Sequence, residues 1–226
     1  MNQVFKPFLR RFILVFFDDI LVYSRNMPDH IEHLRIVLGV LAKNQLYAKM
    51  SKCMFACLEV EYLGHIISRE GVKTDPKKIL TMQEWLVPKD VKSLRGFLGL
   101  TCYYKNFVKG YGHIAAPLAA FLRKNSFYWG AKAEAAFHQL KLAISSPPVL
   151  ALPNFSKTLT VECDASGSGI SAVLMQELQP ISFHNQVLKG SALTLSTYKK
   201  EFLALISAMK KWRPYLVGRP FVIKTD

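Results

Sequence analysis

The chain has 226 residues with 50% hydrophobic content, and 30 Lys and Arg against 16 Asp and Glu give a net charge of +14. This length is sufficient for a buried core and fits one large or two modest domains, of which we expect two. The basic excess is spread along the chain among aromatic residues, which favours a nucleic-acid partner over an anionic membrane. No apolar run approaches the roughly 18 residues of a membrane span, so we expect no membrane partner.

The N-terminal segment is similar to a secretory signal for only a few residues, because the acidic pair Asp18-Asp19 ends its apolar run. We therefore expect a protein that is not exported and whose four cysteines are free thiols. Cys53, Cys57 and His65 could be considered as zinc ligands. No second cysteine pair with finger-like spacing follows, so buried thiols are the preferred interpretation.

Residues 13–24, ILVFFDDILVYS, contain two runs rich in β-branched and aromatic residues on either side of Asp18 and Asp19. The pattern predicts a β-hairpin with the acidic pair as its two-residue turn. Such a turn normally favours Asn-Gly or Asp-Gly, because both central residues need positive φ. Two adjacent carboxylates repel each other. A hard divalent cation, which prefers oxygen ligands, reverses this repulsion when it binds them. On this dipeptide alone, a solvated acidic turn is the favoured alternative.

The next segments carry signals for helices and strands. Residues 28–44 have apolar residues at helical spacing. In residues 52–68 apolar and polar residues alternate and a glycine is present, which indicates strands and a turn. Helix starts are expected at Asp75-Pro76 and at Asp90, because Asp is a favourable N-cap and Pro a favourable first residue. Residues 123–129 are predicted to be a linker. A further helix over residues 133–144 ends before two prolines.

The C-terminal part predicts strands at residues 159–163, 170–176, 180–186 and 221–225, with a helix at 194–212 before the last strand. The first strand ends at Asp164 and the last runs into Asp226. Glu201 lies in the helix, at the edge of its expected apolar stripe. That stripe consists of Tyr198, Phe202, Leu205, Met209 and Trp212.

The hairpin motif resembles the aromatic-x-Asp-Asp palm hairpin of reverse transcriptases from gypsy-type retrotransposons (Metaviridae). Further segments resemble the same family in the same order: EHL at 32–34, YAKMSKCMF at 47–55, YLGHIIS at 62–68, LRGFLGL at 94–100, PPVLALPNF at 147–155 and CDASGSGISAVLMQ at 163–176. The resemblance implies an α+β or α/β fold. A partial polymerase palm and a helical thumb are then followed by an incomplete ribonuclease H-like mixed sheet with helices.

The resemblance implies three regions. Residues 1–88 would be the C-terminal part of the palm, residues 89–126 thumb-like helices and a linker, and residues 127–226 a C-terminally truncated ribonuclease H-like domain. The thumb would grip a primer–template duplex, with ammonium and guanidinium groups on phosphates and rings on sugar edges. The residues expected there are Lys92, Arg95, Tyr103, Tyr104, Lys105 and Lys109. For each one the alternative of a core tyrosine or a merely solvated lysine stays open.

The resemblance also implies the metal chemistry. Asp18 and Asp19 would bind polymerase metal ions, and Asp164, Glu201 and Asp226 those of the nuclease, with Mg²⁺ expected and Mn²⁺ as an alternative. The partners would be an RNA·DNA hybrid, a primer–template and, in the intact family, dNTPs, with a dimer or other Pol domains as further partners. The compartment would be the cytoplasm, with virus-like particles and nuclear access as alternatives.

The chain lacks the fingers, one palm aspartate and one nuclease aspartate of the family pattern, so we expect no DNA synthesis and little or no RNA cleavage by this chain itself. The alternative is a non-catalytic nucleic-acid-binding remnant of a decayed retrotransposon.

Overall fold

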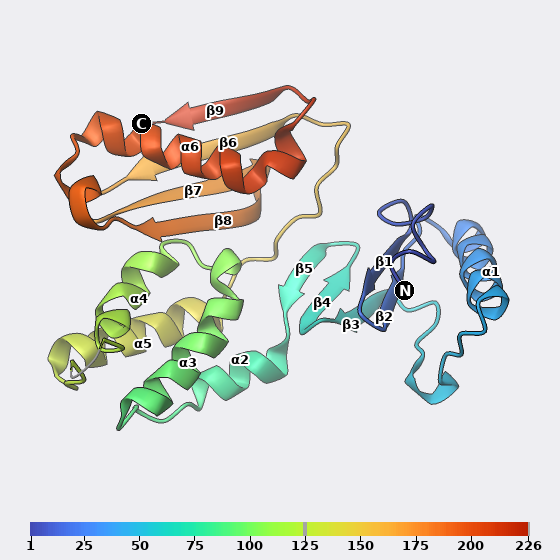
Figure 1. Ribbon diagram of the computed structural model, residues 1–226, viewed down its shortest axis with the longest axis horizontal. Coiled ribbons are helices and arrows are strands. Elements are labelled where there is room, and N and C mark those ends of the chain that lie inside the picture. Colours follow the sequence, from blue (N-terminus) through green and yellow to red (C-terminus); the bar gives the residue numbers. More distant parts are fainter. Residues whose placement is uncertain (124–125, 226) are drawn as a thin grey trace. The chain divides into compact units, whose positions relative to one another are not determined.

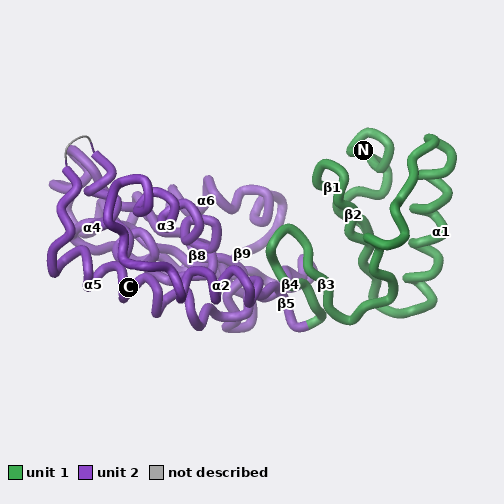
Figure 2. Tube along the Cα trace, turned by 90° about the horizontal axis from the view of Figure 1, so that it is seen from below, with its two compact units in different colours: residues 1–69 green, residues 70–226 purple. Residues whose placement is uncertain are grey.

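A computed structural model describes residues 1–123 and 126–225 (Figure 1). Within these residues the predicted mixture of helices and sheets is confirmed. The chain divides into two compact units, residues 1–69 and 70–226 (Figure 2). The predicted region boundaries at 88/89 and 126/127 stay predictions. Asp226 and part of the predicted linker lie outside the described residues.

The first unit contains two hairpins and a helix. Its elements are β1 (Ile13–Phe16), β2 (Asp19–Val22), α1 (Met27–Lys43), the short 3₁₀ helix η1 (Met50–Lys52), β3 (Glu59–Tyr62) and β4 (His65–Ser68). The helix predicted over residues 28–44 is confirmed, and Asn26 caps it by accepting the Asp29 amide at 2.8 Å. The His33 ring of α1 stacks on Phe12 at 4.0 Å and its Nδ1 lies 2.7 Å from Ser24 Oγ. These contacts attach α1 to the first hairpin.

The turn of the first hairpin differs from the prediction by one residue. Phe16 pairs with Asp19, so the turn is Phe17-Asp18, and Phe17 has a φ of 52°. The observed register places Val22 opposite Ile13, which is fully buried. A turn at Asp18-Asp19 would place Ser24 there instead. Burial of apolar partners therefore overrides the low preference of Phe for positive φ.

The cysteines of this unit also differ from the prediction. Cys57 is exposed and Cys53 is intermediate, so the interpretation as buried thiols is wrong for Cys57. Both lie in the irregular segment between η1 and β3, outside the apolar cluster of the unit. The Cys57 thiol donates to the carbonyl oxygen of Phe55, at 3.4 Å.

The second unit begins with a strand and a group of helices: β5 (Gly71–Thr74), α2 (Pro76–Gln83), α3 (Val91–Tyr103), the 3₁₀ helix η2 (Lys105–Phe107), α4 (Tyr111–Ala120) and α5 (Ala131–Ser145). The two predicted helix starts are confirmed. Asp75 Oδ1 accepts the Lys77 amide at 2.9 Å, and Asp90 Oδ1 accepts the Ser93 amide at 2.6 Å. The helix predicted over residues 133–144 is confirmed as α5, and it packs into one apolar core with α2, α3 and α4.

The remainder of the second unit is a four-stranded sheet with a helix. Its elements are β6 (Leu159–Ala165), β7 (Gly169–Gln176), β8 (Gln179–Val187), the 3₁₀ helix η3 (Gly190–Thr194), α6 (Thr197–Leu216) and β9 (Phe221–Thr225). The strand order is β8-β7-β6-β9, and β9 alone runs parallel to its neighbour (Figure 1). All four predicted strands and the long helix are confirmed. None of the helices in the described ranges combines the length and the apolar character that crossing a membrane requires.

The buried face of α6 differs from the predicted stripe. Lys200, Ala204, Ala208, Trp212 and Leu216 are buried, whereas Tyr198 is 79% exposed, Phe202 57% and Met209 39%. Of the predicted residues, Trp212 is the one that is fully buried. Ala204 and Ala208 let the helix axis approach the sheet closely, and this close approach selects small side chains for the interface. The prediction followed side-chain size and therefore selected the wrong face.

Candidate functional site

The first candidate site is the tip of the β1–β2 hairpin, where Asp18 and Asp19 are both exposed. Asp18 lies in the turn and Asp19 begins β2, so the two carboxylates are adjacent at one end of the hairpin. The pKa of the Tyr62 phenol on β3 is raised, first by burial and then by the charge of Asp19. The charge of Asp19 therefore acts on the second hairpin of the same unit. The tip offers two carboxylates with the hard oxygen donors that Mg²⁺ prefers.

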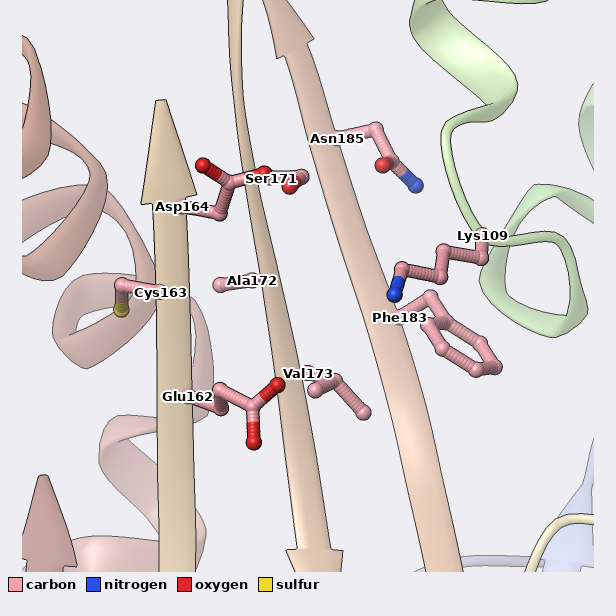
Figure 3. Close-up of a pocket in the computed structure, with 9 residues that line it drawn as sticks. All are labelled: Lys109, Glu162, Cys163, Asp164, Ser171, Ala172, Val173, Phe183 and Asn185. Atoms are coloured by element: carbon pink, nitrogen blue, oxygen red, sulfur yellow. The ribbon is translucent and has the colours of Figure 1, made fainter. Parts of the chain in front are cut away.

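The second candidate site is a pocket of about 100 Å³ on one face of the four-stranded sheet (Figure 3). Glu162 and Asp164 are two positions apart on β6, so both face the same side of the sheet. Ser171 of β7 pairs with Asp164 in the ladder. The Lys109 side chain extends over the sheet from the loop before α4 (Figure 3). The other lining residues are Cys163, Ala172, Val173, Phe183 and Asn185.

Cys163, which lies between the two acids, belongs to the opposite face. Its thiol is buried in the core that the sheet shares with α6. Burial, with a smaller contribution from Glu162, raises the pKa of this thiol to about 11. Cys163 is therefore a protonated core residue at neutral pH, whereas Glu162 and Asp164 are the acidic groups of the pocket.

Glu201 and Asp226 were expected to join Asp164. The Lys200 ammonium donates to the carbonyl oxygen of Gly167 at 3.0 Å, which fixes the first turn of α6 against the turn that follows Asp164. Glu201 is nevertheless absent from the residues lining the pocket. Asp226 lies outside the described residues. Within residues 1–123 and 126–225, no three His, Cys, Asp or Glu side chains are grouped closely enough to hold a metal ion.

The turn after Asp164 is fixed by His113 of α4. The Nε2 atom of His113 lies 3.3 Å from Ser166 Oγ, and its Nδ1 atom lies 3.3 Å from Ser168 Oγ. A Cβ atom on Gly169 would lie 2.6 Å from the same ring. A glycine is therefore needed where the imidazole packs on β7. Helix α4 thus supports the end of the sheet at which Asp164 lies.

The predicted nucleic-acid-binding residues fall into two groups. The residues of the first group are exposed, as a binding surface requires: Lys92, Arg95, Tyr103 and Lys105 on α3 and η2, and Lys109 in the loop before α4. Tyr104 is 1% exposed and packs edge-on against Phe107, so its predicted place on that surface is wrong. It is the C-cap of α3, where the chain turns into η2 and the ring points into the helical core.

Sequence reasoning missed Glu162 and His113 at the sheet site, and it predicted Lys109 as a nucleic-acid-binding residue rather than as part of this pocket. For Glu162 a signal existed, because a residue two positions from Asp164 in a strand shares its face. For the other two, the sequence carries no local signal. Their positions depend on the packing of α4 against β8.

His184 on β8 is a half-buried imidazole at the edge of the sheet. Its Nε2 lies 2.9 Å from Ser207 Oγ, and Ser207 Oγ donates to Gln186 Oε1 at 3.2 Å. Because the serine proton is used for Gln186, the imidazole must donate through Nε2. Burial, followed by the charges of Lys211 and Lys105, lowers the pKa of His184 to about 4. The ring is therefore neutral at pH 7.

This shifted pKa predicts acid sensitivity. The unfolded chain binds a proton at His184 near pH 6.5, whereas the folded chain does so near pH 4. The contribution of His184 to the free energy of unfolding is therefore complete above pH 6.5 and is lost as the pH falls from 6.5 towards 4. Between pH 7 and 5 we expect a loss of about 1–2 kcal/mol from this group, after discounting for solvent screening. Urea unfolding of wild type and His184→Gln at both pH values measures it. Equal losses in the two proteins would contradict the assignment.

Comparison with known proteins gives consistent results. Residues 1–67 match the family described as reverse transcriptase (RNA-dependent DNA polymerase), and residues 129–223 match the RNase H-like domain found in reverse transcriptase. The chain is 37% identical to the Pol polyprotein from transposon 297 of Drosophila melanogaster, over 100% of the chain and 22% of that protein. It is 33% identical to the Pol polyprotein from transposon gypsy of the same organism, over 100% of the chain and 23% of that protein. The chain thus spans about a fifth of these relatives.

Solved structures show the same fold. The foamy viral protease-reverse transcriptase in complex with RNA/DNA hybrid superimposes with a TM-score of 0.89 at 20% identity, over 99% of this chain and 31% of that one. The same viral protein in complex with dsDNA gives a TM-score of 0.87 at 20% identity, over 99% of this chain and 48% of that one.

Proposed function

We propose, since this chain belongs to the reverse transcriptase and ribonuclease H region of gypsy-type retrotransposon Pol polyproteins, that it takes part in copying RNA into DNA and in cutting the RNA strand of RNA·DNA hybrids. The observation that supports this most directly is the position of Asp164, on a central strand of a β8-β7-β6-β9 sheet and facing a polar pocket.

For the polymerase, the residues in question are Asp18 and Asp19. Their oxygens suit Mg²⁺, with Mn²⁺ as an alternative, and their exposure at a hairpin tip leaves them accessible to a primer terminus and a dNTP. The adjacent rings of Phe16 and Phe17 are 50% and 77% exposed and offer flat apolar surface beside the acids. Such surface suits contact with a base or a sugar.

For the nuclease, Asp164 and Glu201 fit the donor chemistry of a divalent ion, with Asp226 as the third proposed ligand. Asp164 lies on β6 and Glu201 follows Lys200, which anchors α6 to the turn after Asp164. Divalent ions bound there would supply an activated water and stabilise the leaving 3′ oxygen. Lys109 over the same sheet face provides a cation that attracts the RNA phosphates.

A second candidate function is nucleic-acid binding without chemistry. It is favoured by the exposed cations Lys92, Arg95 and Lys105. On this hypothesis the affinity for a hybrid falls steeply with salt but does not depend on Mg²⁺.

Incubation of purified protein with a labelled RNA·DNA hybrid, with and without Mg²⁺, distinguishes the two functions. We expect the chain to bind the hybrid and to cleave it weakly at most, and any cleavage to fall to background in Asp164→Asn. Glu177→Gln is the matched control, because it removes an exposed carboxylate from the turn between β7 and β8, where Glu177 pairs with Lys157 at the surface. Binding without any cleavage would support the second function, and cleavage that survives Asp164→Asn would contradict the nuclease assignment.

A further inference from the structure

Two lysines from distant parts of the sequence lie on segments that are hydrogen-bonded to each other, Lys105 on η2 and Lys211 on α6. Lys211 of α6 donates to Asn106 Oδ1 of η2 at 3.2 Å. Burial, and after it the charge of Lys105, lowers the pKa of Lys211; burial, followed by the charges of Lys211 and Lys105, lowers that of His184. The ion pairs found among the described residues include neither lysine.

Among the residues that the structure describes, no carboxylate contributes to the pKa shift of Lys211 or forms an ion pair with either lysine. His184 is neutral and donates to Ser207, which in turn donates to Gln186. Two ammonium groups therefore lie near each other beside neutral polar groups, and their mutual repulsion is reduced by a bound anion. Asn106 accepts through its carbonyl oxygen, and its amide NH₂ is a further donor.

We propose that Lys105, Asn106 and Lys211 together bind one backbone phosphate of a nucleic-acid duplex. This inference rests on the proposed function, and it adds Asn106 and Lys211 to the surface formed by the thumb-like helices. The site connects that surface with the ribonuclease H-like sheet through the contact between η2 and β8. Tyr103, 52% exposed and two residues before Lys105, offers a ring for the adjoining sugar.

The test measures binding of an RNA·DNA hybrid across a range of NaCl concentrations. We expect Lys105→Gln and Lys211→Gln each to weaken binding about 5–10-fold and to lower the slope of log K against log [salt] by about one. The double variant should be little weaker than either single variant, because both lysines bind the same phosphate. Lys132→Gln on α5 is the control for an equal change in net charge, and we expect it to leave the slope unchanged.

Asn106→Asp separates binding from folding. The new carboxylate would pair with Lys211 and relieve the repulsion between the lysines, so the melting temperature should be maintained or raised while hybrid binding weakens. A variant that both melts earlier and binds less would mean that the residues have a purely structural role, which would overturn the proposal.

The remaining outcomes distinguish the two levels of inference. If wild-type protein fails to bind the hybrid, the proposed function fails. If wild type binds but the Lys105 and Lys211 variants behave like Lys132→Gln, the phosphate site alone is wrong. Replacing chloride by inorganic phosphate at constant ionic strength tests the source of the anion. If free phosphate binds at the two lysines while the Lys105 and Lys211 variants bind the hybrid as wild type does, the site holds free phosphate instead. That result would also overturn the assignment to a backbone phosphate.

Discussion

Replacing Phe97 with alanine is expected to lower the free energy of unfolding by about 3–5 kcal/mol, the cost of removing a large aromatic ring from a closed core. Phe97 of α3 is fully buried. Its ring lies 4.7 Å from that of Phe137 on α5 and 6.1 Å from that of Trp85. These contacts connect α5 to α3 inside the helical core.

Urea unfolding of wild type, Phe97→Ala, Phe137→Ala and the double variant measures both the cost and the coupling between the rings. A coupling of about 0.5–1.5 kcal/mol is expected for such an aromatic pair. Leu142→Ala is the control, because Leu142 is 75% exposed on α5 and should change stability by less than about 0.5 kcal/mol. A cost below about 1 kcal/mol for Phe97→Ala would contradict the packing of α5 against α3.

The parts of the fold that sequence predicts well are those set by local chemistry. Asp75 and Asp90 cap helices through hydrogen bonds to amides two and three residues ahead, so the signal is contained within one turn. Apolar and polar residues alternate in the strand containing Asp164, because one face of the strand packs on α6 and the other carries polar residues. A pattern of this kind requires no knowledge of distant residues.

The parts that sequence misses depend on distant partners. The turn of the first hairpin is set by the pairing of Ile13 with Val22, which a turn preference does not report. The buried face of α6 is set by how closely the sheet approaches Ala204 and Ala208. Tyr104 is buried because α3 ends there and the chain turns into the core. In each case tertiary packing overrides a preference based on residue type alone.

The candidate site follows the same division. Asp164 was predictable from its place at the end of a strand, but its support by His113 was not, because α4 precedes it by some 50 residues of chain. Asn185 of β8 completes this support, since its Oδ1 accepts from the Gly110 amide at 2.9 Å and its Nδ2 donates to the Val108 carbonyl at 3.2 Å. The segment that precedes the sheet therefore supports the end of the sheet at which Asp164 lies.

Gly71→Ala is expected to lower the free energy of unfolding by about 3 kcal/mol or more. The site has no room for a Cβ atom, and its backbone conformation is one that alanine rarely adopts. Gly71 has a φ of 138°, and a Cβ atom there would lie 2.2 Å from the carbonyl oxygen of Leu150. That oxygen accepts the Val72 amide at 2.8 Å, and the Leu150 amide donates to the Val72 carbonyl at 3.0 Å. Relief of the clash would break this bridge and move Leu150, a buried residue of the helical core.

Thermal and urea unfolding of Gly71→Ala, compared with Gly99→Ala, test this expectation. Gly99 lies inside α3, and a Cβ atom there would meet no described atom within 4 Å, so alanine should stabilise the protein by about 0.5–1 kcal/mol. Both substitutions replace glycine with alanine, but they should change the free energy of unfolding in opposite directions. A melting temperature for Gly71→Ala within about 2 °C of wild type would mean that β5 does not approach Leu150 as described. The bridge attaches β5 to the segment between α5 and β6, so its loss should also loosen the chain leading into the strand that carries Asp164.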